Sequence, residues 1–216
     1  MGHYTSEAMI GRPLALAYLL FAIFCLSLSG CSAPAWYIGV GGKYNEAKTE
    51  VARPQGANLD KAILNLEGIV TQNPTYRDSL TLLGGAYYKK SRYQDAFQIL
   101  QRALAVNKDD EIAWILLGLS QLRLGDDQRG LDSIKGGITL LSRAMQDEYR
   151  GFSGWDRNGI VRTALRRATF SATKGLEEKD NIFRSGEALL QRINDEEWYQ
   201  QHSDRVIKRR EENIAY

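Results

Sequence analysis

The 216-residue sequence contains little histidine and cysteine, the residue types on which most zinc and nucleophilic sites depend. Its two histidines are His3 and His202, and its two cysteines are Cys25 and Cys31. Zinc sites use clusters of these residues, and Cys–His or Ser–His nucleophiles need a histidine as base. Once an N-terminal signal is removed, only His202 and Cys31 remain. The sequence therefore predicts no metal, no cofactor, no disulfide and no enzymatic activity.

Charge of one sign is not in excess. The chain has 28 basic and 26 acidic residues, which gives no reason to expect nucleic acid as a partner. Carboxylate pairs such as Glu177 and Glu178 lie in charged stretches, where solvated charge is expected rather than an acid–base pair with separated pKa values. Only four prolines and 44% hydrophobic residues indicate an ordinary globular chain.

No apolar run reaches the roughly 20 residues that a membrane-spanning helix needs. An apolar stretch of fifteen residues without a charge, residues 14–28, reads LALAYLLFAIFCLSL and follows Arg12. A short apolar core after a basic residue is typical of an export signal. Both Met1 and Met9 are possible starts of that signal.

The residues that end this stretch, Leu28-Ser29-Gly30-Cys31, resemble the lipobox of bacterial lipoproteins. The resemblance implies a signal peptide over residues 1–30, diacylglycerol on the Cys31 thiol, and a further acyl chain such as palmitate on the new amino group. By the same resemblance, Ser32 favours a location at the outer membrane, facing the periplasm. A location at the inner membrane remains an alternative. The alternatives are an ordinary signal peptide with a chance cysteine, or an uncleaved anchor.

The segment after the cysteine is rich in residues that break helices. Residues 31–57 include Gly39, Gly41, Gly42, Pro54 and Gly56. The sequence predicts a lipid-anchored tether here, with one or two helical turns at most.

The strongest pattern in the rest of the chain is a repeat of 34 residues. At this shift Leu80 falls on Trp114, Leu83 on Leu117 and Gly84 on Gly118. A second set also recurs at small or apolar positions: Ala96, Leu100 and Ala103 fall on Gly130, Ile134 and Gly137. A fixed period of this length indicates stacked helical repeats.

The segment LTLLGGAYYKKSRYQDAFQILQRALAVNKD resembles a tetratricopeptide repeat (TPR), with its leucine-glycine pair, Tyr87 and the small residues named above. The following repeat carries Trp114 but departs from the family at Gln121, Gly130 and Gly137. The resemblance covers residues 58–141. It implies an all-α, TPR-like solenoid of helical hairpins with about 2.5 repeats.

Beyond the repeats, helical spacing of apolar residues predicts two more helices. Val161, Leu165 and Ala168 mark the first, and Ile182 and Ile193 lie in the second. Residues 142–197 are expected to cap the solenoid, and residues 198–216 to form a polar tail.

TPR proteins generally bind peptides or helices along the concave face lined by the first helix of each repeat. By that resemblance, the predicted partner-binding groove consists of Asp78, Thr81, Gly85, Tyr88, Lys89, Ile112, Ile115, Leu119, Leu122 and Arg123. The second half of this set is strongly apolar. Either the C-terminal helices or a partner fills that half.

Two functions follow from these features. The first is a membrane-anchored interaction scaffold or assembly factor that docks an unidentified envelope protein, with outer-membrane pilotins as an analogy of architecture. The second is a periplasmic module that binds a small ligand or cell-wall fragment through Tyr88, Trp155 and Trp198.

Overall fold

The computed structural model describes residues 39–53, 57–145, 149–151 and 154–214, with only the backbone of residue 150 and of residues 201–214. The predicted signal peptide, the lipobox and Cys31 lie outside the described residues. Residues 40–216 group into one compact unit. The described part consists of helices joined by turns and contains no strand.

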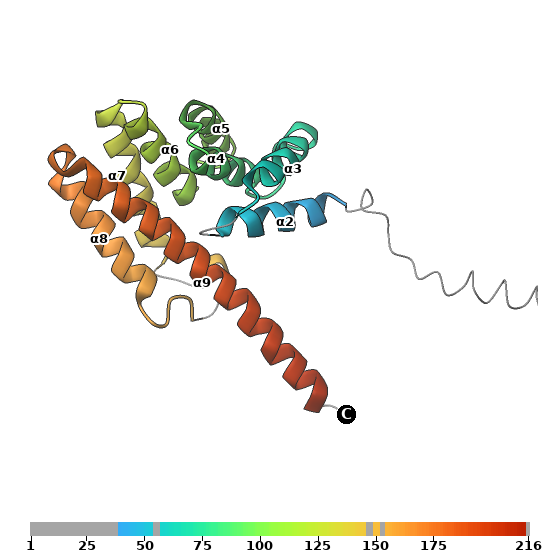
Figure 1. The fold of residues 1–216 in the computed structure, drawn as a ribbon. Helices are drawn as coiled ribbons and strands as arrows, with labels where there is room; N and C mark the ends of the chain where they lie inside the picture. The colour runs from blue at the N-terminus through green and yellow to red at the C-terminus, as the bar shows by residue number, and fades with distance from the viewer. Residues whose placement is uncertain (1–38, 54–56, 146–148, 152–153, 215–216) are drawn as a thin grey trace, which may run out of the picture. The chain divides into compact units, whose positions relative to one another are not determined.

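Six helices form three successive hairpins in the described chain (Figure 1). The hairpins pair α2 (Val40–Ala52) with α3 (Leu59–Gln72), α4 (Ser79–Lys89) with α5 (Tyr93–Val106), and α6 (Glu111–Arg123) with α7 (Asp127–Ala144). The first helices of the hairpins contact one another in the order α2, α4, α6. This arrangement confirms the all-α, TPR-like solenoid.

Helix α2 lies within the segment that the sequence predicted as a tether, so that prediction is wrong for residues 40–52. Tyr44, Ala47 and Val51 of this helix are buried. The helix contacts α3, α4 and α9 and completes the first hairpin, which gives three repeats instead of about 2.5. The sequence hid it because Gly41 and Gly42 occupy its first turn and few of its residues are apolar.

The glycines of the third hairpin let two backbones touch. A Cβ atom placed on Gly118 would lie 2.5 Å from the carbonyl oxygen of Gly130. A Cβ atom on Gly137 would lie 2.9 Å from the carbonyl oxygen of Glu111. Glycine replaces the alanine of the preceding repeat at Gly130 and Gly137 because α6 and α7 approach too closely for any side chain.

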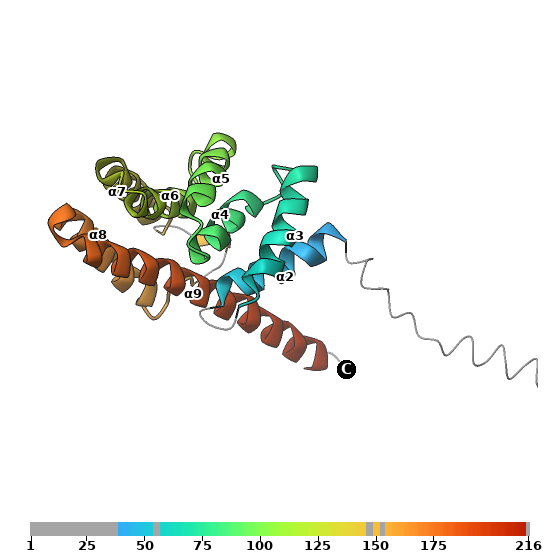
Figure 2. The ribbon, with the colours of Figure 1, turned by 45° about the horizontal axis from the view of Figure 1, so that its top comes forward.

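Helices α8 (Ile160–Lys174) and α9 (Lys179–Ile214) form a further hairpin, which packs beside the solenoid (Figure 2). The short 3₁₀ helix η3 (Leu176–Glu178) joins them, and η2 (Tyr149–Gly151) lies in the link from α7. The expected apolar residues, Val161, Ala168, Ile182 and Ile193 among them, are buried. The backbone of α9 continues through residue 214, so it does not break where the polar tail was predicted to begin.

A buried carboxylate fixes the start of α8. The side chain of Asp156, fully buried, accepts hydrogen bonds from the backbone N–H groups of Val161 and Arg162, both at 2.8 Å. The guanidinium of Arg162 donates to the carbonyl oxygen of Asp156 at 3.0 Å. These contacts satisfy amide groups that a helix start leaves without partners. Arg162 therefore has a structural role.

No helix in the described ranges combines the length and the apolar character that crossing a bilayer requires.

Candidate functional site: the concave groove

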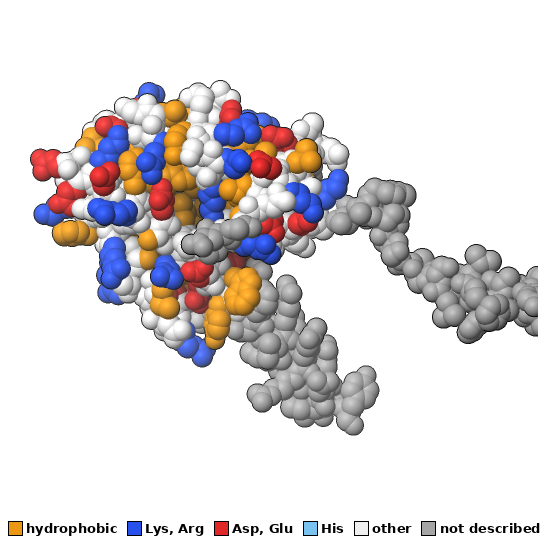
Figure 3. All heavy atoms as spheres, viewed as in Figure 1, with side chains coloured by type: hydrophobic (Ala, Val, Ile, Leu, Met, Phe, Trp, Pro, Cys, Tyr) orange, Lys and Arg blue, Asp and Glu red, His pale blue; other side chains and the backbone are white. Residues whose placement is uncertain are grey.

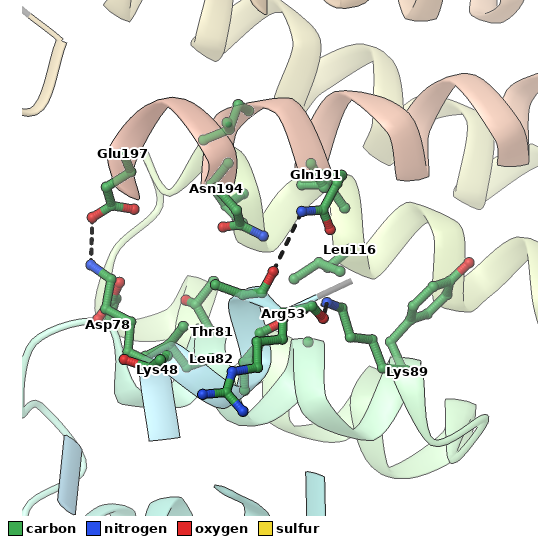
Figure 4. Close-up of a pocket in the computed structure, with 18 of the residues that line it drawn as sticks. Lys48, Arg53, Asp78, Thr81, Leu82, Lys89, Leu116, Gln191, Asn194 and Glu197 are labelled. Carbon is green, nitrogen blue, oxygen red and sulfur yellow. Dashed lines mark hydrogen bonds and ion pairs between the residues drawn. The ribbon is translucent and has the colours of Figure 1, made fainter. Parts of the chain in front are cut away.

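A cavity of about 1320 Å³ lies on the concave side of the solenoid (Figure 4). Its walls come from α2, α4, the N-terminal part of α6, and α9. In Figure 4, Gln191, Asn194 and Glu197 point from α9 toward side chains of α2 and α4. We call this cavity the groove.

The first half of the predicted binding set does line the groove. Asp78, Thr81, Gly85, Tyr88 and Lys89 all lie in its wall, on or beside α4. They lie there because the 34-residue register aligns α4 with the first helix of each repeat. Their role in binding a partner stays a prediction.

The second half of the set lies elsewhere, apart from Ile112, which lines the groove. The side chain of Ile115 would contact a Cβ atom on Gly137 of α7, and Leu122 one on Gly130 of the same helix. The placement of Ile115 and Leu122 in the groove is therefore wrong. The close approach of α6 and α7 turns this stripe of α6 into the hairpin interface.

Helix α9 covers the remaining part of α6. Leu119 is fully buried, and its Cδ2 atom lies 3.1 Å from where a Cβ atom on Gly186 of α9 would stand. The Arg123 guanidinium lies 3.8 Å from the ring centroid of Phe183 in α9. Of the two occupants considered for this half, the structure places the chain's own α9 there. Leu119 and Arg123 therefore contact α9 instead of lining the open groove.

Polar contacts hold α9 against α4 and α6. The Tyr88 hydroxyl donates to Glu187 at 2.6 Å, and the Arg123 guanidinium lies 3.3 Å from the same carboxylate. Burial, together with this hydrogen bond, raises the pKa of Tyr88 well above its usual value. The phenol therefore stays protonated as a donor at neutral pH.

A second set of contacts joins α2 to α9 and to α4. Lys48 pairs with Glu197 at 2.5 Å, and Gln191 donates to the carbonyl oxygen of Ala52 at 3.4 Å. The Lys89 ammonium donates to the carbonyl oxygen of Val51 at 2.5 Å. Gln191 and Lys89 thus satisfy carbonyl groups at the C-terminal end of α2, where the helix dipole also favours a cation such as the Lys89 ammonium. Although part of Lys89 stays exposed, desolvation of its ammonium group lowers its pKa.

The floor of the groove is tied together by the chain's own polar groups. The Tyr44 hydroxyl donates to Asp78, and the Thr81 hydroxyl donates to Asp110 at 2.6 Å. Asp110 also accepts from the backbone N–H of Ala113, at 2.8 Å, and so caps α6. Burial and the contact with Asp78 raise the pKa of Tyr44. These bonds hold α2, α4 and α6 in fixed register and give the groove a preorganised shape.

The aromatic residues proposed for a small ligand do not converge. Trp155 is buried against Tyr149, with ring centroids 4.9 Å apart, and it does not line the groove. Tyr88 lies in the wall, and Trp198, which is 57% exposed, lies on the α9 side. Among the described residues, no group of three or more His, Cys, Asp or Glu side chains is placed to hold a metal ion.

Sequence reasoning missed the parts of the groove that come from outside the predicted repeats. These residues come from α2 and α9: Tyr44, Asn45, Lys48, Val51, Leu190, Gln191, Asn194 and Glu197. The 34-residue shift gave no signal for α2, because Leu80, Leu83 and Gly84 fall back on Glu46, Thr49 and Glu50. No periodicity indicates against which surface α9 packs.

The family that part of the sequence matches agrees with the repeats described above. Residues 55–120 match the tetratricopeptide repeat family, a stretch that spans α3, α4, α5 and most of α6 but less than a third of the chain. Among solved structures, the chain is similar to the crystal structure of MamA, with 18% identity over 90% of this chain and 99% of that chain and a TM-score of 0.46. No curated protein matches the sequence. TPR folds typically act as non-catalytic scaffolds that bind proteins, and the matched repeats support that general role here.

Proposed function

We propose that this chain is a docking scaffold whose groove binds a segment of a partner protein between α4 and α9. The observation that carries the proposal is the division of the concave face. Helix α9 already fills the α6 half, whereas a cavity of about 1320 Å³ remains over α2, α4 and the start of α6. A pocket of this size exceeds what most small ligands need and suits a peptide or a helix.

The groove chemistry favours a segment with both apolar and hydrogen-bonding groups. Leu82, Leu116 and Leu190 supply apolar area, and Asn45 and Asn194 supply amide groups that bond to a peptide backbone. Trp198 lies beside them as a large, half-exposed side chain, the type that dominates binding energy in protein interfaces. The charged side chains of the walls largely pair with one another, so they contribute orientation more than affinity.

The proposal includes a membrane location, which the lipobox supports. Diacylglycerol on Cys31 and an acyl chain on its amino group would hold the scaffold in the bacterial envelope, at the outer membrane facing the periplasm. Several acyl chains together anchor a protein stably, whereas a single chain does so only marginally. The role would be the assembly or positioning of an envelope complex, as pilotins do, without enzymatic activity.

Photo-crosslinking in living cells tests the docking role. A photoreactive amino acid is placed at Asn45 or Asn194 in the groove and, as matched controls, at the exposed positions Arg102 and Lys135 of α5 and α7. We expect one discrete adduct of defined mass from both groove positions and none from the controls. Equal adducts from all four positions, or adducts from the controls alone, would contradict a groove-specific scaffold.

A further inference from the structure

A second concave surface, separate from the groove, lies between α8 and α9. Two hollows of about 560 and 300 Å³ share Thr163, Arg167, Ser185 and Ala188 and so form one continuous furrow. None of the residues that line this furrow lines the groove. We call it the arginine furrow, because four arginines lie along it: Arg166, Arg167, Arg184 and Arg192.

The arginine furrow carries positive charge with little internal compensation. Within the described part of the chain, Arg166 and Arg167 have no ion pair, and Arg184 bonds to the neutral amide oxygen of Asn181 at 2.8 Å. Only Arg192 pairs with a carboxylate, that of Asp195 at 3.2 Å. No Asp or Glu lines either hollow. A furrow with this charge attracts anions, and arginine forks suit phosphate groups.

Exposed apolar side chains accompany the charge. Ile160 is 48% exposed and Phe170 is 63% exposed, and both line the furrow. Ten residues separate them, which places them about 15 Å apart along α8. The Lys174 ammonium lies 5.5 Å from the centroid of the Phe170 ring. Figure 3 shows blue Lys and Arg side chains over the side of the molecule formed by α8, beside isolated orange ones.

This combination fits a lipid surface better than a protein surface. A protein interface needs a contiguous apolar core from which charge is depleted, whereas these apolar side chains are isolated among arginines. Interfacial membrane binding uses the opposite design, in which cations meet anionic headgroups and single aromatic side chains insert at the acyl boundary.

We infer that the α8–α9 face docks on an anionic lipid bilayer, with lipid phosphate groups in the arginine furrow and Phe170 inserted beside them. Because the furrow and the groove use different faces of α9, a docked scaffold keeps its groove open to a partner. This docking requires neither partner binding nor a lipid on Cys31. It therefore goes beyond the proposed scaffold function, and each can fail without the other.

A fluorescent reporter of bilayer contact tests the inference. The full chain carries Cys25→Ser and Cys31→Ser, so that an NBD label at Thr163→Cys in the furrow is unique. A hexahistidine tag and nickel-chelating lipid bring equal amounts of protein to vesicles of phosphatidylcholine alone or with one-third phosphatidylglycerol. We expect blue-shifted NBD emission, quenched by doxyl lipid, only on the anionic vesicles. A label at Thr139→Cys on α7 should stay in water on both.

Charge-matched variants identify the surface responsible. Each arginine near an anionic bilayer contributes on the order of 1 kcal/mol, so R166Q/R167Q/R184Q should lower the ratio of docked to undocked chains on the order of 100-fold. R102Q/K135Q/R143Q removes the same charge from exposed positions of α5 and α7 and should leave docking unchanged. Circular dichroism checks that both variants fold. Equal emission from both labels would overturn the inference, as would an equal loss of docking in both variants. Binding of a soluble polyanion while the Thr163 label stays in water on anionic vesicles would also overturn it.

Discussion

Two neighbouring glycines of α7 offer a sharp test of the packing in the third hairpin. Gly136 is exposed, and a Cβ atom there would meet nothing within 4 Å. Gly137 is buried, and a Cβ atom there would lie 2.7 Å from Cγ1 of Ile115 and 2.9 Å from two backbone atoms of α6. Both glycines lie in the interior of the same helix, so replacing either by alanine gains the same helix propensity, about 1 kcal/mol.

The difference between the two alanine variants isolates the steric cost of separating α6 from α7. Backbone atoms cannot rotate away from a new methyl group, so we expect Gly137→Ala to incur an overpacking cost of about 1–3 kcal/mol. Gly136→Ala should therefore raise the free energy of unfolding by about 1 kcal/mol, whereas Gly137→Ala should leave it unchanged or lower it by up to roughly 2 kcal/mol.

Urea denaturation followed by circular dichroism measures this difference, and thermal denaturation gives a second reading. For a chain of this size, 1 kcal/mol corresponds to a shift in Tm of about 2–4 °C. Equal stabilisation by both variants would refute the close approach of the two backbones. It would also refute our explanation of why glycine replaces alanine in this repeat.

Three further results are expected. Burial and a hydrogen bond to Glu67 raise the pKa of Tyr87 to about 12, so the stability that this phenol contributes is present below pH 10 and is lost as the pH rises through 12. Burial raises the pKa of Tyr44 and Tyr88 as well. Absorbance at 295 nm should show phenols still protonated at pH 11, and titration of every tyrosine near pH 10 would contradict this. Glu187→Gln should speed hydrogen exchange in α9, because it weakens the contacts with Tyr88 and Arg123 by about 1 kcal/mol. Asp195→Asn, which alters an exposed pair within α9, should not speed it. Equal effects of the two substitutions would mean that Glu187 does not hold α9 against the solenoid. Cys31→Ala should abolish incorporation of labelled palmitate, and an unlabelled wild-type protein would remove the lipid anchor from the proposal.

The repeats were predictable because their packing is local and periodic. Gly84 lies against Leu100, since a Cβ atom there would stand 2.5 Å from Cγ of that leucine, and the 34-residue shift aligns such pairs. Helix α2 escaped prediction because its buried side chains are only Tyr44, Ala47 and Val51. A glycine-rich start and a polar exterior make such a segment resemble a linker.

The candidate site was predictable only where it belongs to one repeat. The residues on and beside α4 follow from the family register, whereas Ile115 and Leu122 depart from it because glycines draw α7 toward α6. The α9 wall depends on contacts such as Lys48 with Glu197, which join residues 149 positions apart. No local pattern specifies a contact of that separation, so the sequence left the occupant of the α6 half open.

The central claim is that the open part of the groove is the docking surface. The most direct measurement compares two leucine substitutions in the amount of partner retained when the protein is purified from crosslinked envelope extracts. Leu82→Arg places a cation in the groove, whereas Leu64→Arg changes an exposed leucine, 69% accessible, on α3 outside it. We expect Leu82→Arg to lose the crosslinked partner at least tenfold while Leu64→Arg retains it, with both variants folded. Full retention by Leu82→Arg, or equal loss in the two variants, would contradict the claim.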